Sequence, residues 1–371
     1  MAYSNTILDF SLSKNETSNT ININVESEGE HLLYLNLSSN SDWSVSNQES
    51  ACISVLLNGQ YQSDIITFYG NSIFTYKILL GQLNVGSHTL QFNFDESKSR
   101  PNVTEVYFES MEIISSSDFS ELDEIIFEYS PIIYGRDLIN TYESAYTDIP
   151  LLMWHTISSK SNGNQILKTI RYNIIFSNED SRISGSDGLN DMMYDFARTT
   201  DIEWVYIVQL DENNNLISES YQGAGHIETP FSGDKIGNHP ILKTSTLNCL
   251  FSDEGTSQYL FALSPEHILI DSIITNRAYS TDKNTPPFFI PRRENLMDEN
   301  PWTYKIMADE MKNENKYEIP GDYNTYAISD AKNYLYIEFE GRTSLPTNLY
   351  LYANSNNDCN YYGKVEAERY F

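Results

Sequence analysis

The chain has 371 residues, of which 40% are hydrophobic and 13% aromatic, and this composition excludes a globally disordered protein. Its 23 Lys and Arg residues stand against 52 Asp and Glu residues, which gives a formal net charge of −29. Because a field of that sign repels phosphate backbones and anionic membrane surfaces, we expect no nucleic acid as a partner.

The sequence as it stands shows no signal for membrane insertion or secretion. No run approaches the roughly 18 consecutive apolar residues that a transmembrane helix needs. The first residues also lack the basic and then apolar pattern of a signal peptide. We therefore expect a soluble protein without a membrane span, either secreted or cytoplasmic, and the oligomeric state stays open.

Short strand-like segments and turn signals alternate from Thr20 to Glu112. Residues 21–25 and 31–37 alternate apolar with polar side chains, and residues 53–57 run into Asn58-Gly59, a pair that tight hairpins prefer. Further segments of strand length are 61–69, 74–80 and 88–94. Turns at this spacing predict an antiparallel β-sandwich over residues 1–117.

Three parts of this region, Val55–Gly59, Phe74–Gly81 and Leu83–Leu90, together resemble a known architecture. The order of an xxNG hairpin and an LxxGxHxL strand pair is similar to that in the jelly-roll sandwiches of carbohydrate-binding modules and galactose-binding-like domains. The resemblance covers about the first third of the chain. It implies an accessory domain that binds sugar or packs against its neighbour.

The rest of the chain predicts a larger β-rich domain over residues 124–371. Residues 115–123 are polar and turn-rich, which is typical of a linker. Residues 188–198 and 301–313 favour helices, and the second opens with a proline. Segments of strand length are 125–129, 131–134, 151–157, 168–176, 202–210, 216–221, 259–263, 334–340 and 348–352. The predicted fold class is therefore mainly β, an N-terminal antiparallel β-sandwich followed by a β-rich domain with about two helices.

Four carboxylates lie where predicted strands begin or end. Glu179 and Asp180 directly follow a strand, where side chains face a cleft or solvent. Asp201 and Glu203 alternate with apolar residues at the start of another strand, just after Arg198, so the two acids are expected to share one face. One interpretation is purely structural: the two carboxylates form ion pairs with Arg198. A pair of carboxylates with different pKa values also supplies the acid and base of a glycosidase or lyase.

Two histidines in glycine-containing segments extend this candidate site. His226 and His239 each follow a glycine closely, and glycine lets the backbone approach a ligand. Both have a structural account as buried, hydrogen-bonded histidines. If they are functional, we expect them to reach the same pocket as Asp201 and Glu203, and with Asp180 or Glu203 they could hold a divalent metal.

Five further residues are candidates for substrate binding, together with Arg198. Arg292 and Arg293 present two guanidinium groups, whose fork suits a substrate carboxylate such as that of a uronic acid. Trp154 and Trp302 have aromatic faces on which a sugar ring can stack. Asn248 lies at the end of the region after Phe176 in which polar candidates alternate with apolar runs, and it completes the set.

These candidate carboxylates, histidines and binding residues predict a carbohydrate-active enzyme, either a glycoside hydrolase or a polysaccharide lyase. It would act on a glycan or another polar small molecule. P-loop, GxGxxG, GxSxG and HExxH motifs do not occur in the sequence. Two alternatives stay open. One is a non-catalytic protein, such as a surface protein or toxin component, that binds a glycan or a protein. The other is a metal-dependent enzyme of different chemistry, and a divalent metal is the one cofactor under consideration.

Overall fold

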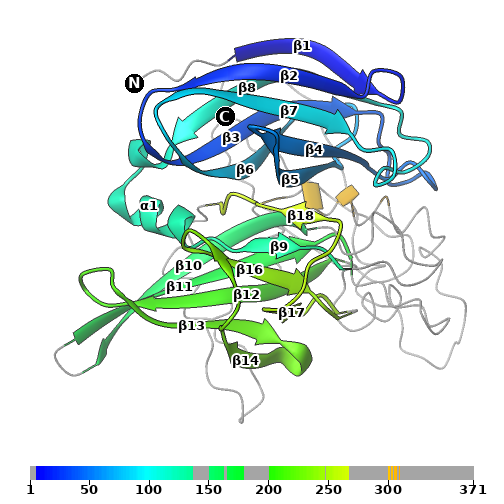
Figure 1. The fold of residues 1–371 in the computed structure, drawn as a ribbon. Helices are drawn as coiled ribbons and strands as arrows, with labels where there is room; N and C mark the ends of the chain where they lie inside the picture. Colours follow the sequence, from blue (N-terminus) through cyan, green and yellow to red (C-terminus); the bar gives the residue numbers. More distant parts are fainter. Residues whose placement is uncertain are drawn as a thin grey trace, which may run out of the picture. The chain divides into compact units, whose positions relative to one another are not determined.

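The computed structural model describes residues 6–136, 150–162, 165–178, 200–246 and 248–266, with residues 300, 302, 303, 305, 306 and 309. The chain divides into two compact units, Met1–Tyr334 and Leu335–Phe371, and the described residues all lie in the first. Strands dominate this part (Figure 1), which confirms the mainly β fold class. None of the helices within the described ranges is long and apolar enough to cross a membrane.

The N-terminal region forms the predicted antiparallel sandwich from two four-stranded sheets, β1-β8-β3-β6 and β2-β7-β4-β5. Side chains that point inward from both sheets, among them Leu35, Phe92 and Phe108, form a continuous buried core. The Asn58-Gly59 hairpin has positive φ angles of 51° and 78°, as its sequence predicts. The strands are β1 (Thr6–Ser13), β2 (Ser18–Val25), β3 (Gly29–Ser39), β4 (Ala51–Leu57), β5 (Gln60–Thr67), β6 (Phe74–Leu83), β7 (Gly86–Phe94) and β8 (Glu105–Ser115).

Two further sheets follow the sandwich. One is five-stranded and antiparallel, in the order β10-β11-β12-β13-β14, and the other has the order β15-β16-β9-β18, with β17 paired to β16 and a parallel pair between β16 and β9. Two short 3-10 helices are η1 (Ser116–Asp118) and η3 (Ala224–His226). The strands are β9 (Ile132–Tyr134), β10 (Pro150–Asn162), β11 (Gln165–Phe176), β12 (Asp201–Leu210), β13 (Leu216–Gly223), β14 (Ile227–Pro230), β15 (Lys235–Ile236), β16 (His239–Thr244), β17 (Phe251–Ser252) and β18 (Leu260–Phe261).

A helix, α1 (Glu121–Glu128), lies where a linker and then a strand were expected. The Ser120 side chain accepts a hydrogen bond from the Asp123 backbone, and the Asp123 carboxylate accepts one from the Ser120 backbone, which is a capping box. Ile125 and Tyr129 then recur at helical spacing and pack into the core. The predicted strand over residues 125–129 is wrong because so short an apolar run has no decisive period, whereas the cap upstream favours a helix.

The second predicted helix falls partly within the described residues. Trp302, Thr303, Lys305, Ile306 and Asp309 are helical, in agreement with a helix over 301–313. The Lys305 ammonium pairs with the Asp309 carboxylate at 2.6 Å, one turn apart. The predicted helix over 188–198 and the predicted strands over 334–340 and 348–352 lie outside the described residues.

Residues 260–264 join the sandwich to the sheet that contains β9. β18 pairs with β9, and beyond it the Leu79 backbone N–H donates to Ala262 O at 2.8 Å. The Ser264 backbone N–H donates to Lys77 O at 3.1 Å, so the edge strand β6 gains a neighbour. The division into domains 1–117 and 124–371 stays a prediction, because this segment hydrogen-bonds to both parts.

Candidate functional site

The outer face of the sheet β1-β8-β3-β6 carries three successive rows of cross-strand partners. Each row takes one residue from β6, one from β3 and one from β8, and directly opposed residues of neighbouring strands share a face. The first row is apolar and packs with α1, β9 and β18, whereas the second and third rows are polar. The rows are Leu79–Leu32–Ile114, Lys77–Tyr34–Glu112 and Thr75–Asn36–Ser110.

A groove of about 690 Å³ lies over the two polar rows. The sandwich supplies most of its lining, and the segment after β18 and the helical residues near position 302 supply the rest. The lining residues are Tyr34, Asn36, Tyr69, Ile73, Phe74, Thr75, Lys77, Glu112, Glu266, Asn300 and Trp302. Side chains from distant parts of the chain therefore face one open space large enough for a small-molecule ligand.

Aromatic rings form one end of the groove. The Trp302 ring stacks on Phe68 with centroids 5.2 Å apart and an interplanar angle of 16°. Its ring centroid lies 5.2 Å from that of Phe74 and 6.4 Å from that of Tyr69, in T-shaped arrangements. These contacts hold Trp302 in one orientation while its side chain stays partly exposed in the groove. An ordered, partly exposed aromatic face is what a sugar ring stacks on.

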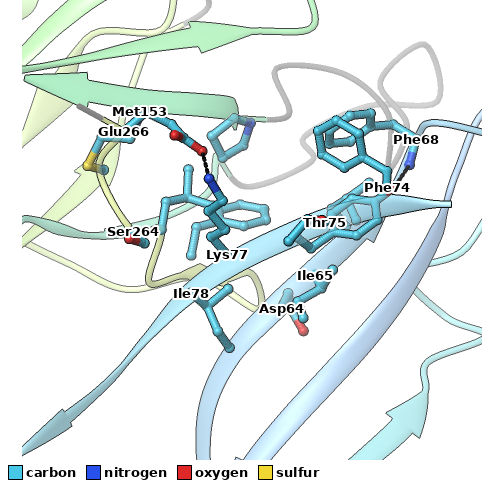
Figure 2. A pocket seen from close by; sticks show the side chains of 15 residues that line it. Asp64, Ile65, Phe68, Phe74, Thr75, Lys77, Ile78, Met153, Ser264 and Glu266 are labelled. Carbon is cyan, nitrogen blue, oxygen red and sulfur yellow. Dashed lines mark hydrogen bonds and ion pairs between the residues drawn. The ribbon is translucent and has the colours of Figure 1, made fainter. Parts of the chain in front are cut away.

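The middle row of the groove is charged. The Lys77 ammonium lies 2.6 Å from a Glu266 carboxylate oxygen, a pair drawn as a dashed line in Figure 2, and 5.1 Å from the centroid of the Tyr34 ring. On the opposite side of Tyr34, Glu112 forms no ion pair with any described residue. Among the described residues, two carboxylates and one ammonium therefore line the groove, and together they carry one net negative charge.

The third row is fixed by hydrogen bonds that cross three strands. The Thr75 hydroxyl donates to Asn36 Oδ1 at 2.6 Å, and Asn36 Nδ2 donates to the Ser110 hydroxyl at 2.8 Å. This chain fixes the amide of Asn36 in one orientation. The groove floor therefore offers donors and acceptors at fixed positions, which lowers the entropy that a polar ligand loses on binding.

Two of the predicted catalytic residues, Glu203 and His226, come together at a separate place. The Gln222 side-chain nitrogen lies 2.6 Å from Glu203 Oε2 and 2.7 Å from His226 Nδ1, and the two end groups are 3.7 Å apart. Glu203 and Gln222 are buried, whereas the His226 ring is about half exposed. His226 adopts φ of 60°, next to Gly225 at 72°, a conformation that few non-glycine residues adopt.

The other predicted acid in the strand, Asp201, is also buried. Asp201 and Glu203 lie two residues apart in β12, opposite Phe176 and Ile174 of β11. Asp201 Oδ1 accepts a hydrogen bond from the Ile202 backbone at 2.8 Å. The two carboxylates therefore lie at the start of β12, and of the two, Glu203 accepts the hydrogen bond from the Gln222 amide that also contacts His226.

His239 lies among different partners from those of His226. Its Nδ1 is 2.9 Å from Ser130 O, and its Nε2 is 3.3 Å from Glu30 Oε2 at the start of β3. Burial alone would lower the pKa of His239, but the hydrogen bond and charge of Glu30 outweigh burial and raise the pKa above its usual value. Gln82 also donates to Glu30. This histidine links β16 to the sandwich.

The His239–Glu30 pair predicts a pH-dependent stability. A raised pKa in the folded state means that the stabilisation is complete below about pH 6.5 and is lost as the pH rises through the folded-state pKa. We expect the difference in unfolding free energy between the wild type and His239→Gln to be smaller at pH 9 than at pH 6, because the ion pair with Glu30 is lost as His239 gives up its proton. Urea unfolding of both proteins at the two pH values measures it, and a difference that stays constant or grows contradicts the pair.

Of the remaining predicted site residues, the structure describes Trp154 and Asn248 but not the others. Trp154 lies in β10 opposite Asn173, and Asn248 accepts a hydrogen bond from the Thr246 hydroxyl at 2.8 Å. The described residues include no group of three or more His, Cys, Asp or Glu arranged to hold a metal ion. Glu179, Asp180, Arg198, Arg292 and Arg293 lie outside the described residues.

The groove was not predicted from the sequence, although Trp302 was named as a stacking residue. Tyr34 and Asn36 occupy the alternate positions of a strand in which Leu33, Leu35 and Leu37 point into the core. That alternation identifies residues that face outward. It does not show that β6 and β8 are the neighbours of β3, and only this pairing assembles the rows.

No protein-family model matches the sequence, and comparison with curated proteins finds no match. One similar solved structure is the CBM36-1 domain of a multidomain xylanase from the hindgut metagenome of Trinervitermes trinervoides, at 13% identity and a TM-score of 0.23 over 31% of this chain and 88% of that chain. Another is a CBM36 carbohydrate-binding module in complex with calcium and xylotriose, at 11% identity and a TM-score of 0.22 over 28% of this chain and 78% of that one.

A third similar structure is CBM35 from Paenibacillus barcinonensis, at 14% identity and a TM-score of 0.22 over 31% of this chain and 84% of that chain. The predicted antiparallel sandwich is confirmed by the strand order of its two sheets, and these three carbohydrate-binding modules are similar to the chain over 28–31% of its length. Identities at this level transfer neither a ligand nor an activity to this chain.

Proposed function

We propose that this protein binds a glycan in the groove over the polar rows of the sheet β1-β8-β3-β6. The observation that carries the proposal is the combination of a held aromatic face with fixed polar rows in one open groove. The apolar faces of a sugar ring stack on an aromatic ring, and its hydroxyls exchange hydrogen bonds with amide, hydroxyl and carboxylate groups. Trp302 supplies the aromatic ring, and Asn36 and Glu112 supply the hydrogen-bonding groups.

The charges favour a neutral glycan over a polyanionic one. Lys77 is already paired with Glu266 at 2.6 Å, and Glu112 adds a carboxylate that forms no ion pair within the described part of the chain. The whole chain carries a formal charge of −29, which repels a polyuronate at long range. Within the carbohydrate-active classes this favours binding, or hydrolysis of a neutral chain, over a lyase reaction on uronic acids.

A glycoside hydrolase is the second candidate, and the Glu203–Gln222–His226 cluster supports it. A buried carboxylate next to a half-exposed imidazole supplies two groups that can move protons. The strained φ of His226 is a feature that clusters at functional sites. This cluster does not line the groove, so binding and hydrolysis would involve different residues.

One experiment separates the two candidates. We expect the full chain to bind members of a panel of neutral oligosaccharides in a calorimetric titration, without release of new reducing ends during the same incubation. New reducing ends that vanish in both Glu203→Gln and His226→Ala would establish the hydrolase instead, because loss of an acid or base costs roughly 10²-fold or more in rate. Failure to bind any neutral glycan would refute the groove proposal.

A further inference from the structure

A small cavity adjoins the groove on the other side of the Lys77–Glu266 pair. It measures about 50 Å³ and shares Phe74, Thr75, Lys77 and Glu266 with the lining of the groove. Figure 2 shows Lys77 reaching from β6 toward Glu266, whereas Thr75 and Phe74 lie further along the same strand, near Phe68. The ion pair thus lines both the cavity and the groove.

Carbon atoms make up most of the cavity wall. Ile65, Phe68, Ile78, Met153 and Leu263 contribute apolar side chains. Polar groups in the wall include the Lys77–Glu266 pair, Thr75 and Ser264, whose backbone N–H donates to Lys77 O at 3.1 Å. Asp64 also lines the cavity, but its carboxylate is engaged by the Lys98 ammonium at 2.9 Å.

The volume limits what can enter. At roughly 10–15 Å³ for each water-sized group, the space of about 50 Å³ holds three to five such groups. An acetyl group has three non-hydrogen atoms, one of them polar. A hydroxyl has a single atom and leaves most of the apolar wall uncovered, whereas a sugar ring is too large.

We infer that the cavity is a subsite for an acetyl substituent of a glycan bound in the groove, so that the preferred ligands are neutral glycans that carry acetyl groups. This inference rests on the proposed glycan binding. The acetyl methyl packs against Ile65, Ile78 and Leu263, and the acetyl oxygen accepts a hydrogen bond from the Lys77 ammonium. Admission of the group requires the side chains of Lys77 and Glu266 to move apart or aside.

The test compares two oligosaccharides that have the same β-1,4 backbone and no charge, triacetylchitotriose and cellotriose, in calorimetric titrations of the full chain. We expect the acetylated ligand to bind about tenfold more tightly, because burial of one methyl group contributes about fourfold and one hydrogen bond a similar factor. Ser264→Leu, which fills the cavity and keeps the backbone hydrogen bond, should abolish the preference, whereas the control Ser264→Ala should keep it.

The outcomes separate this inference from the proposal beneath it. Equal affinity of the wild type for both ligands overturns the acetyl subsite, leaves the groove as the glycan site and means that the cavity holds water only. If neither ligand binds, the acetyl subsite is overturned, and the titrations with the whole panel of neutral oligosaccharides decide the groove proposal. A preference that persists in a folded Ser264→Leu also overturns the subsite. If that variant does not fold, a nuclear Overhauser effect between the ligand acetyl methyl and the Ile65 or Ile78 methyl groups decides, and its absence from the wild-type complex counts against the subsite.

Discussion

Replacing Lys98 with methionine is expected to lower the free energy of unfolding by about 3–5 kcal/mol, the usual cost of removing one partner from a buried ion pair. The Lys98 ammonium lies 2.9 Å and 3.1 Å from the two carboxylate oxygens of Asp64, which is 1% exposed. It also contacts the Tyr61 hydroxyl at 3.0 Å. Without Lys98 the Asp64 carboxylate would stay buried without its counter-charge.

The cost is large because Asp64 is held on several sides. Ser54 Oγ donates to its Oδ1 at 2.8 Å, the Leu260 backbone donates to its Oδ2 at 3.3 Å, and the Tyr61 hydroxyl donates to the same oxygen. Burial, followed by the charge of Asp64, raises the pKa of Tyr61 far above its usual value, so the phenol stays a donor. These contacts connect the sandwich to β18. Disturbing Asp64 therefore weakens the sandwich and its connection to β18.

A matched control is available in the same sandwich. Lys14 pairs with Glu96 at 3.0 Å, but the two side chains are 30% and 65% exposed. An exposed pair contributes less than about 1 kcal/mol, so Lys14→Met should leave the unfolding curve almost unchanged. Urea unfolding of the three proteins measures the difference, and equal small losses in the two variants would show that Lys98 is not the buried counter-charge described here.

Replacing Tyr34 with alanine is expected to weaken glycan binding by about 30-fold, which corresponds to about 2 kcal/mol for a central aromatic contact. Tyr34 stands in the middle of the charged row, with Lys77 5.1 Å from its ring centroid and Glu112 opposite it in the register. Its removal takes away an aromatic face of the groove and the surface that orders Lys77. Because the side chain is only partly buried, the loss of stability should be smaller than that of Lys98→Met.

Tyr107 is the control for this prediction. It lies in β8 of the same sheet and is partly exposed, but it donates to Asp9 at 3.0 Å and does not line the groove. Tyr107→Ala should therefore keep the wild-type affinity in the same calorimetric titration. A similar loss in both variants would indicate a general disturbance of the sheet, and unchanged affinity in Tyr34→Ala would place the ligand elsewhere.

Much of the architecture was predictable because local signals decide it. Alternating apolar and polar residues set the strands of the sandwich, and Asn58-Gly59 fixed a hairpin whose positive φ angles the structure shows. Residues 125–129 failed as a strand since the Ser120–Asp123 capping box, a signal outside the apolar run, determines the helix. The pairing of β3 with β6 and β8, which are distant in the sequence, has no local signal, and the polar rows of the groove depend on this pairing.

The candidate residues show the same limit. Glu203 and His226 were named from their types and positions, and the structure joins them through Gln222, a residue that no pattern distinguished. His239 has the same glycine-containing context as His226, yet its partners are Glu30 and Ser130, more than a hundred residues away. Residue type indicates what a side chain can do, and only the tertiary contacts decide which neighbour it meets.

The most direct test of the groove is a nuclear magnetic resonance titration of the isotope-labelled full chain with the neutral oligosaccharide that binds most tightly. Glycan binding in the groove predicts that the shifted backbone resonances gather on β3, β6 and β8 around Tyr34, Lys77 and Glu112, with the Trp302 indole among them. Shifts that gather instead around Glu203 and His226, with the three strands unaffected, would contradict it.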